Sequence, residues 1–230
     1  MVRHGVRLGT DGVLALKRSG LWDQALEVLD PGATALRAEL LTDRFFWRLD
    51  GVAEAGAAVA ELLQADAALG AFLDAQLAYT RVLFAIAPRP GDPERAEEGF
   101  AAAASDARLT NWATLWQGVV AEHLRHDPGR ARRHFTHACS GARKDADPLL
   151  ESYALRHLGA QDLEGGDATG LDLLRRSYHL RAALGARPQT AAAAATLAAY
   201  LPEGDEAAQL SRMAAATARE LHLTWLLPTG

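Results

Sequence analysis

The chain has 230 residues, of which 49% are hydrophobic but only 7% aromatic, and its formal net charge is −5 at pH 7. Alanine and leucine dominate the apolar share, and Ile86 is the only isoleucine. This composition argues against β-sandwiches and parallel sheets, whose strands are rich in valine and isoleucine. The acidic balance gives no general affinity for nucleic acids or anionic membranes, so we expect neither as a partner.

The cysteine content and the apolar segments bear on the compartment. Cys139 is the single cysteine, so no disulfide can form within the chain, which favours a reducing compartment. Residues 1–5 carry no apolar stretch of the kind that a signal peptide needs. The most apolar segment, 69–87, is interrupted by polar and charged side chains that a membrane span tolerates poorly. We therefore expect a cytoplasmic protein.

Turn-forming residues recur along the chain and divide it into short helices. In chain order they are Gly20, Asp30-Pro31-Gly32, Asp50-Gly51, Pro88–Pro93, Asp127-Pro128-Gly129, Asp147-Pro148, Gly165-Gly166-Asp167, Arg187-Pro188 and Pro202–Asp205. Short connections make successive helices antiparallel neighbours, so we expect a single all-α domain of about five to six helical hairpins. Residues 12–79 are expected to form divergent helical pairs, residues 80–223 clearer repeats, and residues 224–230 an apolar C-terminal tail.

The segment 110–125 shows the helical pattern most clearly. Its large apolar residues are Trp112, Leu115, Trp116, Val119 and Val120, which form one stripe of an amphipathic helix. The following Asp127-Pro128 ends that helix, because the residue before a proline disfavours the α region.

Several turns carry an aspartate at the expected start of a helix, sometimes followed by proline, as at a capped helix start. Asp92-Pro93 and Asp127-Pro128 show this pattern in full. A shift of 35 residues superimposes them. The same shift places Ala96, Phe100 and Ala103 on Ala131, Phe135 and Ala138. Small residues let helix backbones approach, and the large residue fills the gap between neighbouring pairs. The sequence therefore predicts a repeated helix pair.

This pattern resembles the tetratricopeptide repeat, in which Ala-x3-Phe-x2-Ala on a second helix follows a Leu-Gly pair on the first. The residues that carry the resemblance further along are Leu155, Leu158-Gly159, Gly166, Leu171 and Tyr178. Half-patterns occur at Gly20, Ala25 and Leu29, and at Gly204, Met213 and Ala216. The resemblance implies a right-handed α-solenoid of stacked antiparallel helix pairs, in which the first helices line a concave groove.

In such a solenoid, particular residues of successive first helices face the groove. They are Arg81, Trp116, Gln117, His123, Tyr153, Arg156 and His157. Guanidinium groups bind carboxylate or phosphate, and large aromatic rings supply rigid contact area. We therefore expect a non-enzymatic module, without a cofactor, that recognises a peptide or protein partner, acidic ones included. Arg81 and Arg156 would anchor anions, and Trp116 and Tyr153 would form an apolar platform.

Three alternatives remain open. Helical repeats of this kind also serve as small-molecule sensors of bacterial regulatory systems, and the composition of this chain resembles them. The pairs His123/His126 and His134/His137 have i, i+3 spacing, which places two imidazoles on one helix face, as in a metal-dependent enzyme. The apolar C-terminal tail either folds back on the chain or forms a homodimer surface.

Overall fold

The computed structural model describes residues 8–227, and its regular structure there is helical, with no β-strand. The helices are α1 (Thr10–Arg18), α2 (Trp22–Val28), α3 (Thr34–Arg48), α4 (Val52–Ala65), α5 (Ala67–Leu83), α6 (Asp92–Ala103), α7 (Thr110–His123), α8 (Pro128–Lys144), α9 (Pro148–Glu164), α10 (Gly170–Ala183), α11 (Arg187–Tyr200), α12 (Asp205–Leu221) and the short 3₁₀ helix η1 (Thr224–Leu226). The all-α prediction is confirmed. No helix in this range is both long enough and apolar enough to span a bilayer.

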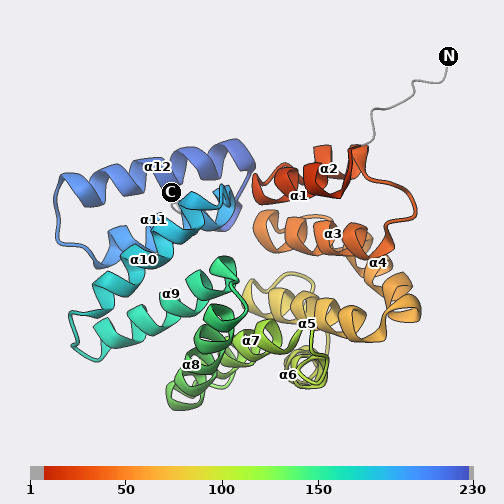
Figure 1. Cartoon of the computed structure of the whole chain (residues 1–230), viewed down its shortest axis with the longest axis horizontal. Coiled ribbons are helices and arrows are strands. Elements are labelled where there is room, and N and C mark those ends of the chain that lie inside the picture. The colour runs from red at the N-terminus through yellow and green to blue at the C-terminus, as the bar shows by residue number, and fades with distance from the viewer. Residues whose placement is uncertain (1–7, 228–230) are drawn as a thin grey trace.

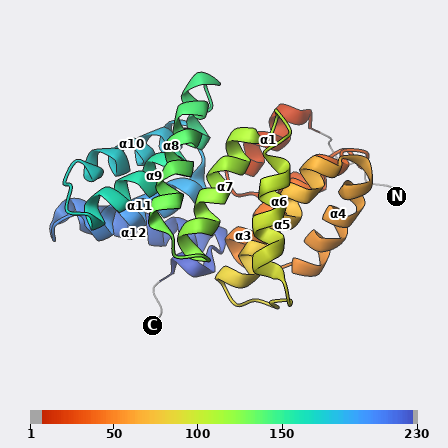
Figure 2. The same ribbon diagram turned by 90° about the horizontal axis from the view of Figure 1, so that it is seen from below.

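Each helix packs on its neighbours in the chain, as a helical repeat requires (Figure 1). The closest contacts lie within the pairs α5–α6, α7–α8, α9–α10 and α11–α12. Seen from below, α1–α6 lie on one side of α7 and α8–α12 on the other (Figure 2). The helices thus follow one another around the molecule, and the last pair returns to the first helices (Figure 1).

The two superimposed triads of the predicted repeat occupy equivalent buried places on α6 and α8. All six side chains are at most 1% exposed. The ring of Phe100 stacks on Trp116 of α7, with ring centroids 5.4 Å apart. The ring of Phe135 stacks in the same way on His157 of α9, at 4.3 Å. Each phenyl ring therefore fills the space between its own helix pair and the next, as the sequence predicts.

The predicted capping by aspartate side chains is present at two turns and absent at a third. Asp127 accepts a hydrogen bond from the Arg130 backbone N–H at 2.8 Å, and Asp147 caps α9 in the same manner. Asp92 is different, because α6 begins at Asp92 itself after Gly91. Its carboxylate accepts hydrogen bonds from a buried arginine and does not cap the helix.

That arginine is Arg81, which we expected to find on the groove as an anion anchor. Its guanidinium donates to both carboxylate oxygens of Asp92, at 2.8 and 2.6 Å, and the backbone N–H of Arg89 donates to the same carboxylate at 2.8 Å. Both side chains are almost fully buried. Burial alone raises the pKa of Asp92, but these hydrogen bonds outweigh it and lower the pKa below its usual value. The pair ties the end of α5 to the start of α6.

The hydrophobic core joins the two regions that the sequence distinguishes. One cluster of buried residues runs from Ala38 in α3 to Leu155 in α9, so the boundary at residues 79 and 80 falls inside a shared core. A second cluster joins Val13 of α1 to Leu221 of α12. The first and last helices of the chain therefore pack together.

Residues 224–227 of the apolar tail add to the contacts between the two ends of the described chain. The indole of Trp225 stacks on Trp47 of α3, with centroids 5.4 Å apart and an interplanar angle of 23°. Arg48 Nε donates to the carbonyl of Leu221 at 3.1 Å. The tail thus folds back on the N-terminal helices, while its last residues, 228–230, lie outside the described residues. A homodimer through the tail stays a prediction, and these contacts reduce the apolar surface that a partner could cover.

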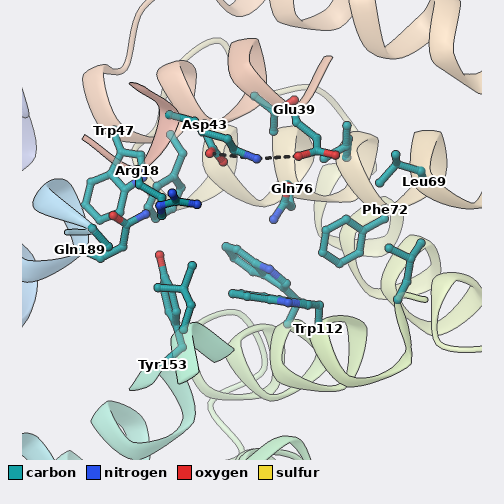
Figure 3. Close-up of a pocket in the computed structure, with 18 of the residues that line it drawn as sticks. Arg18, Glu39, Asp43, Trp47, Leu69, Phe72, Gln76, Trp112, Tyr153 and Gln189 are labelled. Atoms are coloured by element: carbon teal, nitrogen blue, oxygen red, sulfur yellow. Dashed lines mark hydrogen bonds and ion pairs between the residues drawn. The ribbon is translucent and has the colours of Figure 1, made fainter. Parts of the chain in front are cut away.

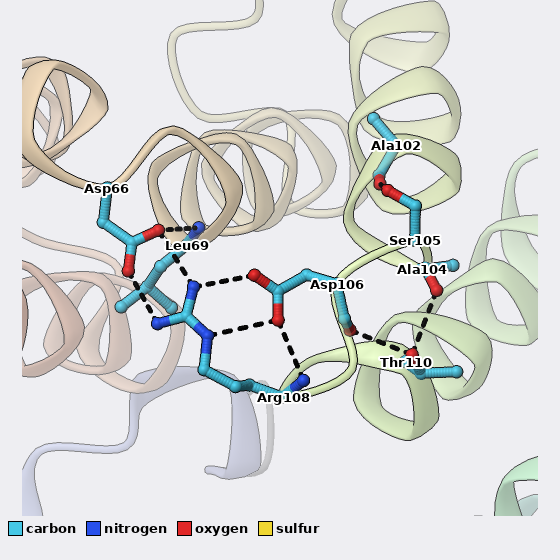
Figure 4. Close-up of polar contacts among 8 residues, drawn as sticks. All are labelled: Asp66, Leu69, Ala102, Ala104, Ser105, Asp106, Arg108 and Thr110. Carbon is cyan, nitrogen blue, oxygen red and sulfur yellow. Dashed lines mark hydrogen bonds and ion pairs between the residues drawn. The ribbon is translucent and has the colours of Figure 1, made fainter.

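A smaller clamp joins the turn between α4 and α5 to the loop before α7 (Figure 4). Arg108 donates to Asp66 at 2.8 and 3.1 Å and to Asp106 at 2.7 Å. Asp66 also accepts from the Leu69 backbone N–H as the N-cap of α5. The hydrogen bonds from Arg108, followed by that of Leu69, lower the pKa of Asp66 from 3.8 to about 2.

Removing the charge of Asp92 should destabilise the fold strongly. Asp92→Asn leaves Arg81 buried without a counter-charge, so we expect the free energy of unfolding in urea to fall by about 3 kcal/mol. Asp74→Asn is the matched control, because it breaks the exposed ion pair with Arg95 and should cost less than about 1 kcal/mol. Equal losses in the two variants would contradict the structural role of the buried pair.

The clamp at Asp66 predicts a specific titration. Since its pKa is lowered in the folded state, ionised Asp66 stabilises the fold above pH 3.8, and this contribution is lost as the pH falls through about 2. In Arg108→Gln, we expect the pKa of Asp66, followed by NMR of its carboxyl carbon, to return towards 3.8. Arg95→Gln should leave it in place, and a pKa near 3.8 in the unmodified protein would refute the clamp.

Candidate functional site

The odd-numbered helices line a cavity of about 420 Å³. Its wall is contributed by α1, α3, α5, α7 and α9, with Ala186 and Gln189 closing it at the start of α11 (Figure 3). These are the first helices of the successive pairs, so the inner surface expected from the sequence exists as the wall of a cavity.

One side of the cavity is aromatic. Trp112 and Trp116 come from consecutive turns of α7, and Tyr153 comes from α9 (Figure 3). The rings of Trp112 and Tyr153 meet edge to face at 5.6 Å, and Trp116 meets Phe46 of α3 at 6.1 Å. Trp112 Nε1 donates to Asp147 at 2.9 Å, which fixes the indole by its polar edge. The arrangement offers flat, rigid surfaces to an apolar ligand.

The opposite side carries a charged cluster from α1 and α3. Lys17 Nζ lies 2.6 Å from Glu39 Oε2 and 3.6 Å from Asp43 Oδ2 (Figure 3). The three side chains keep 21%, 31% and 32% of their surface accessible, although protein surrounds them. Their exposed surface therefore faces the cavity, and the cluster belongs to its wall.

Burial and charge set the pKa values in this cluster. Burial raises the pKa of Asp43, and the negative charge of Glu39 adds to the rise, so that attraction to Lys17 does not restore the usual value. Burial alone lowers the pKa of Lys17, but the two carboxylates outweigh it and hold the pKa above its usual value. Lys17 is therefore fully charged, whereas the ionisation of Asp43 is disfavoured.

Arg18, next to Lys17, also lines the cavity, between Asp43 and Gln189 (Figure 3). Within residues 8–227 no carboxylate lies within ion-pair distance of its guanidinium. Since no carboxylate of the described residues neutralises Arg18, its guanidinium makes this side of the wall favourable for an anionic group.

Three wall residues also have unmet hydrogen-bonding capacity. Thr42 Oγ1, Trp116 Nε1 and Gln189 Oε1 are buried atoms without a hydrogen-bond partner in the described part of the chain. Buried polar atoms are normally paired, so these three atoms are available to polar groups of a ligand in the cavity.

The residues predicted for the groove do not form one site. Trp116 and Tyr153 both line the cavity, whereas Gln117 on α7 is half-buried outside its wall. Arg81 is excluded from any binding surface by its buried pairing with Asp92. The residues of α5 that line the cavity are Leu69, Phe72, Leu73 and Gln76. Arg81 is not among them, because its side chain turns to the start of α6.

The remaining predicted residues, His123, Arg156 and His157, gather with Glu122 at a second place on α7 and α9. Glu122 Oε2 lies 2.7 Å from His157 Nδ1 and 3.3 Å from His123 Nε2. Arg156 Nη1 lies 3.3 Å from His157 Nδ1. Burial lowers the pKa of His157 to about 4, so its imidazole is neutral at pH 7. Burial alone would raise the pKa of Glu122, but hydrogen bonds from both histidines and Gln161 lower it.

The histidine pairs expected as metal ligands are not assembled in this way. In residues 8–227 a single group of three potential ligands comes together, formed by Glu122, His123 and His157. Among these residues His126, His134 and His137 belong to no such group. His126 lies beyond the end of α7, where its backbone is left-handed with a φ of 51°, and His134 and His137 on α8 meet no third ligand.

Several residues that line the cavity were not predicted from the sequence. Lys17, Glu39 and Asp43 lie in the divergent region, where the repeat pattern assigns no inner face. Gln189 reaches the wall only because the last helices return to the first. For Trp112 a signal was present, since it lies one turn before Trp116 on the same stripe.

Comparison with known proteins gives no relative: no family, no curated protein and no solved structure matches this chain.

Replacing Lys17 should expose the repulsion between its two carboxylates. Lys17→Gln is expected to lower the free energy of unfolding by about 1–2 kcal/mol at pH 8, with a smaller deficit at pH 4. Asp43 has a raised pKa in the folded state, so its ionisation destabilises the fold as the pH rises, more so without Lys17.

The double variant Lys17→Gln/Asp43→Asn removes that ionisation, so its own free energy of unfolding should change less between pH 4 and pH 8 than that of Lys17→Gln. Urea denaturation of both variants at pH 4 and pH 8 measures the difference. A single-variant deficit that shrinks as the pH rises would be incompatible with the assigned electrostatics.

Proposed function

We propose that this protein is a non-catalytic small-molecule-binding protein and that its ligand occupies the cavity between the odd-numbered helices. The observation that carries the proposal is a cavity of about 420 Å³ that combines an aromatic wall with a few convergent charged groups. This size and this mixture are typical of small-molecule sites. The sensor alternative raised by the sequence is thereby favoured.

The wall indicates the chemistry of the ligand. A flat apolar body fits against Trp112 and Trp116, and an anionic group, such as a carboxylate, pairs with Arg18, which has no carboxylate partner within residues 8–227. On the same side Glu39 balances the charge of Lys17, and the raised pKa of Asp43 disfavours its ionisation, so Arg18 is the group with which an anion would pair. An aromatic or otherwise flat carboxylate is the ligand class that these residues favour.

The peptide groove expected from the sequence has less support. An extended peptide needs an open channel along several helix pairs, but here α12 and Trp225 pack against α1 and α3. We therefore assign the inner surface to a compact ligand.

We also propose that the helix pairs stack as in a divergent, right-handed tetratricopeptide-like superhelix. Supporting this are the equivalent roles of Phe100 and Phe135 and polar contacts between residues 35 apart, such as Trp112 with Asp147 and Glu122 with His157. Such contacts arise when equivalent helices of successive repeats lie side by side.

A thermal-shift screen against aromatic and aliphatic monocarboxylates tests the proposal. We expect aromatic carboxylates to raise the Tm and to change the tryptophan fluorescence, because Trp112 and Trp116 line the cavity. In Arg18→Gln, titration calorimetry of the best carboxylate should show about 10–100-fold weaker binding.

Arg95→Gln is the matched control, since Arg95 lies on α6 and pairs with Asp74 away from the cavity. It should bind as tightly as the unmodified protein. Absence of any carboxylate binding, or equal loss in both variants, would overturn the proposal.

A further inference from the structure

A second group of side chains converges two helical turns beyond the aromatic wall of the cavity. Glu122 and His123 lie near the C-terminal end of α7, and His157 lies on α9. One ligand atom from each residue falls within 4.8 Å of the others. The exposed fractions are 21% for Glu122, 33% for His123 and 7% for His157, so the group is shielded on one side and reachable on the other.

The repeat explains why these side chains meet. His157 follows Glu122 by 35 residues, the repeat shift, so the two occupy equivalent positions on neighbouring inner helices. His123 is adjacent to Glu122 in the chain and turns its Nε2 atom towards the same carboxylate, at 3.3 Å. The stacking of α7 and α9 thus places two imidazoles on either side of one carboxylate.

Surrounding groups hold all three side chains in place. The hydroxyl of Tyr79 lies 2.5 Å from His123 Nδ1, which leaves Nε2 facing Glu122. Gln161 Nε2 donates to Glu122 Oε1 at 2.9 Å, so that Oε2 faces the histidines. The ring of Phe135 stacks on His157. Metal-binding histidines and carboxylates are typically oriented by such outer hydrogen bonds.

We propose that Glu122, His123 and His157 form a binding site for a divalent transition-metal ion of the zinc class, with an open coordination position. Two imidazoles and one carboxylate are a ligand set that zinc accepts in proteins. With bonds of about 2.0–2.1 Å, the ligand atoms of a tetrahedral ion are about 3.3 Å apart. The separation of Glu122 Oε2 and His123 Nε2 already has this value, and the 2.7 Å contact to His157 widens as the ion replaces the shared proton.

The positive charge of Arg156 distinguishes a metal site from a histidine cluster that binds no ion. Its Nη1 atom lies 3.3 Å from His157 Nδ1, and within residues 8–227 it has no carboxylate partner in an ion pair. A guanidinium so close to a ligand atom opposes a cation, and the half-buried side chain has to swing towards solvent when the ion binds. Removing this charge should therefore strengthen metal binding, whereas a histidine cluster without a site would not respond.

The experiment uses untagged full-length protein that has been dialysed against EDTA. We expect titration calorimetry with Zn²⁺ to give one site per chain, and Co²⁺ to give the visible absorption of a tetrahedral complex. His123→Gln and Glu122→Gln should each weaken Zn²⁺ binding at least tenfold. Arg156→Gln should tighten it severalfold.

His137→Gln is the matched control, since His137 is an exposed histidine on α8 outside the group. It should leave the affinity unchanged. Circular dichroism verifies that each variant folds, and His123 is chosen over the more buried His157 for this reason. Failure to bind one equivalent of Zn²⁺, or equal affinity in His123→Gln and His137→Gln, would overturn the site. Neither result depends on a ligand in the cavity.

Discussion

The position of one phenyl ring between successive helix pairs governs the rest of this structure. Phe100 and Phe135 hold equivalent places, and each stacks on an aromatic ring of the next inner helix. Those two partners are Trp116, which forms the cavity wall, and His157, which belongs to the cluster on α7 and α9. Because close-packed interiors leave little freedom of rotation, the same contacts that stack the repeats also orient the side chains available for binding.

The inner helices carry two kinds of surface along their length. The rings of Trp112 and Tyr153 lie in the N-terminal halves of α7 and α9, and Arg18 lies at the C-terminal end of α1. Glu122 and His123 at the C-terminal end of α7 meet His157 in the middle of α9 and present carboxylate and imidazole groups. Tyr79 joins the two regions, because its ring meets Trp116 at 5.3 Å and its hydroxyl meets His123. The two proposed sites, one for an organic ligand and one for a metal ion, thus lie about two turns of helix apart on one scaffold.

The features that depend on contacts between nearby residues were predicted from local sequence patterns. The triads around Phe100 and Phe135, the caps at Asp127 and Asp147 and the stripe of α7 all follow from spacing and side-chain size. Arg81 was misassigned because periodicity gives the face of a helix but not the group that faces it. The cluster of Lys17, Glu39 and Asp43 could not be found, since α1 and α3 lie in the divergent region, where the repeat pattern assigns no inner face. Gln189 escaped for another reason: it reaches the cavity only because the two ends of the chain meet, and no short spacing encodes that contact.

The contact of the tail with α3 also affects the order in which the helices are expected to unfold. In an open array of repeats each terminal pair has a neighbour on only one side, and the ends fray before the middle. Here Trp225 and Leu221 give the first helices a neighbour on their outer side, and Val13 and Trp47 do the same for the last. Within residues 8–227 neither end pair lacks a neighbour, so we expect the outermost helices to unfold cooperatively with the rest and their amide protons to exchange on the timescale of global unfolding.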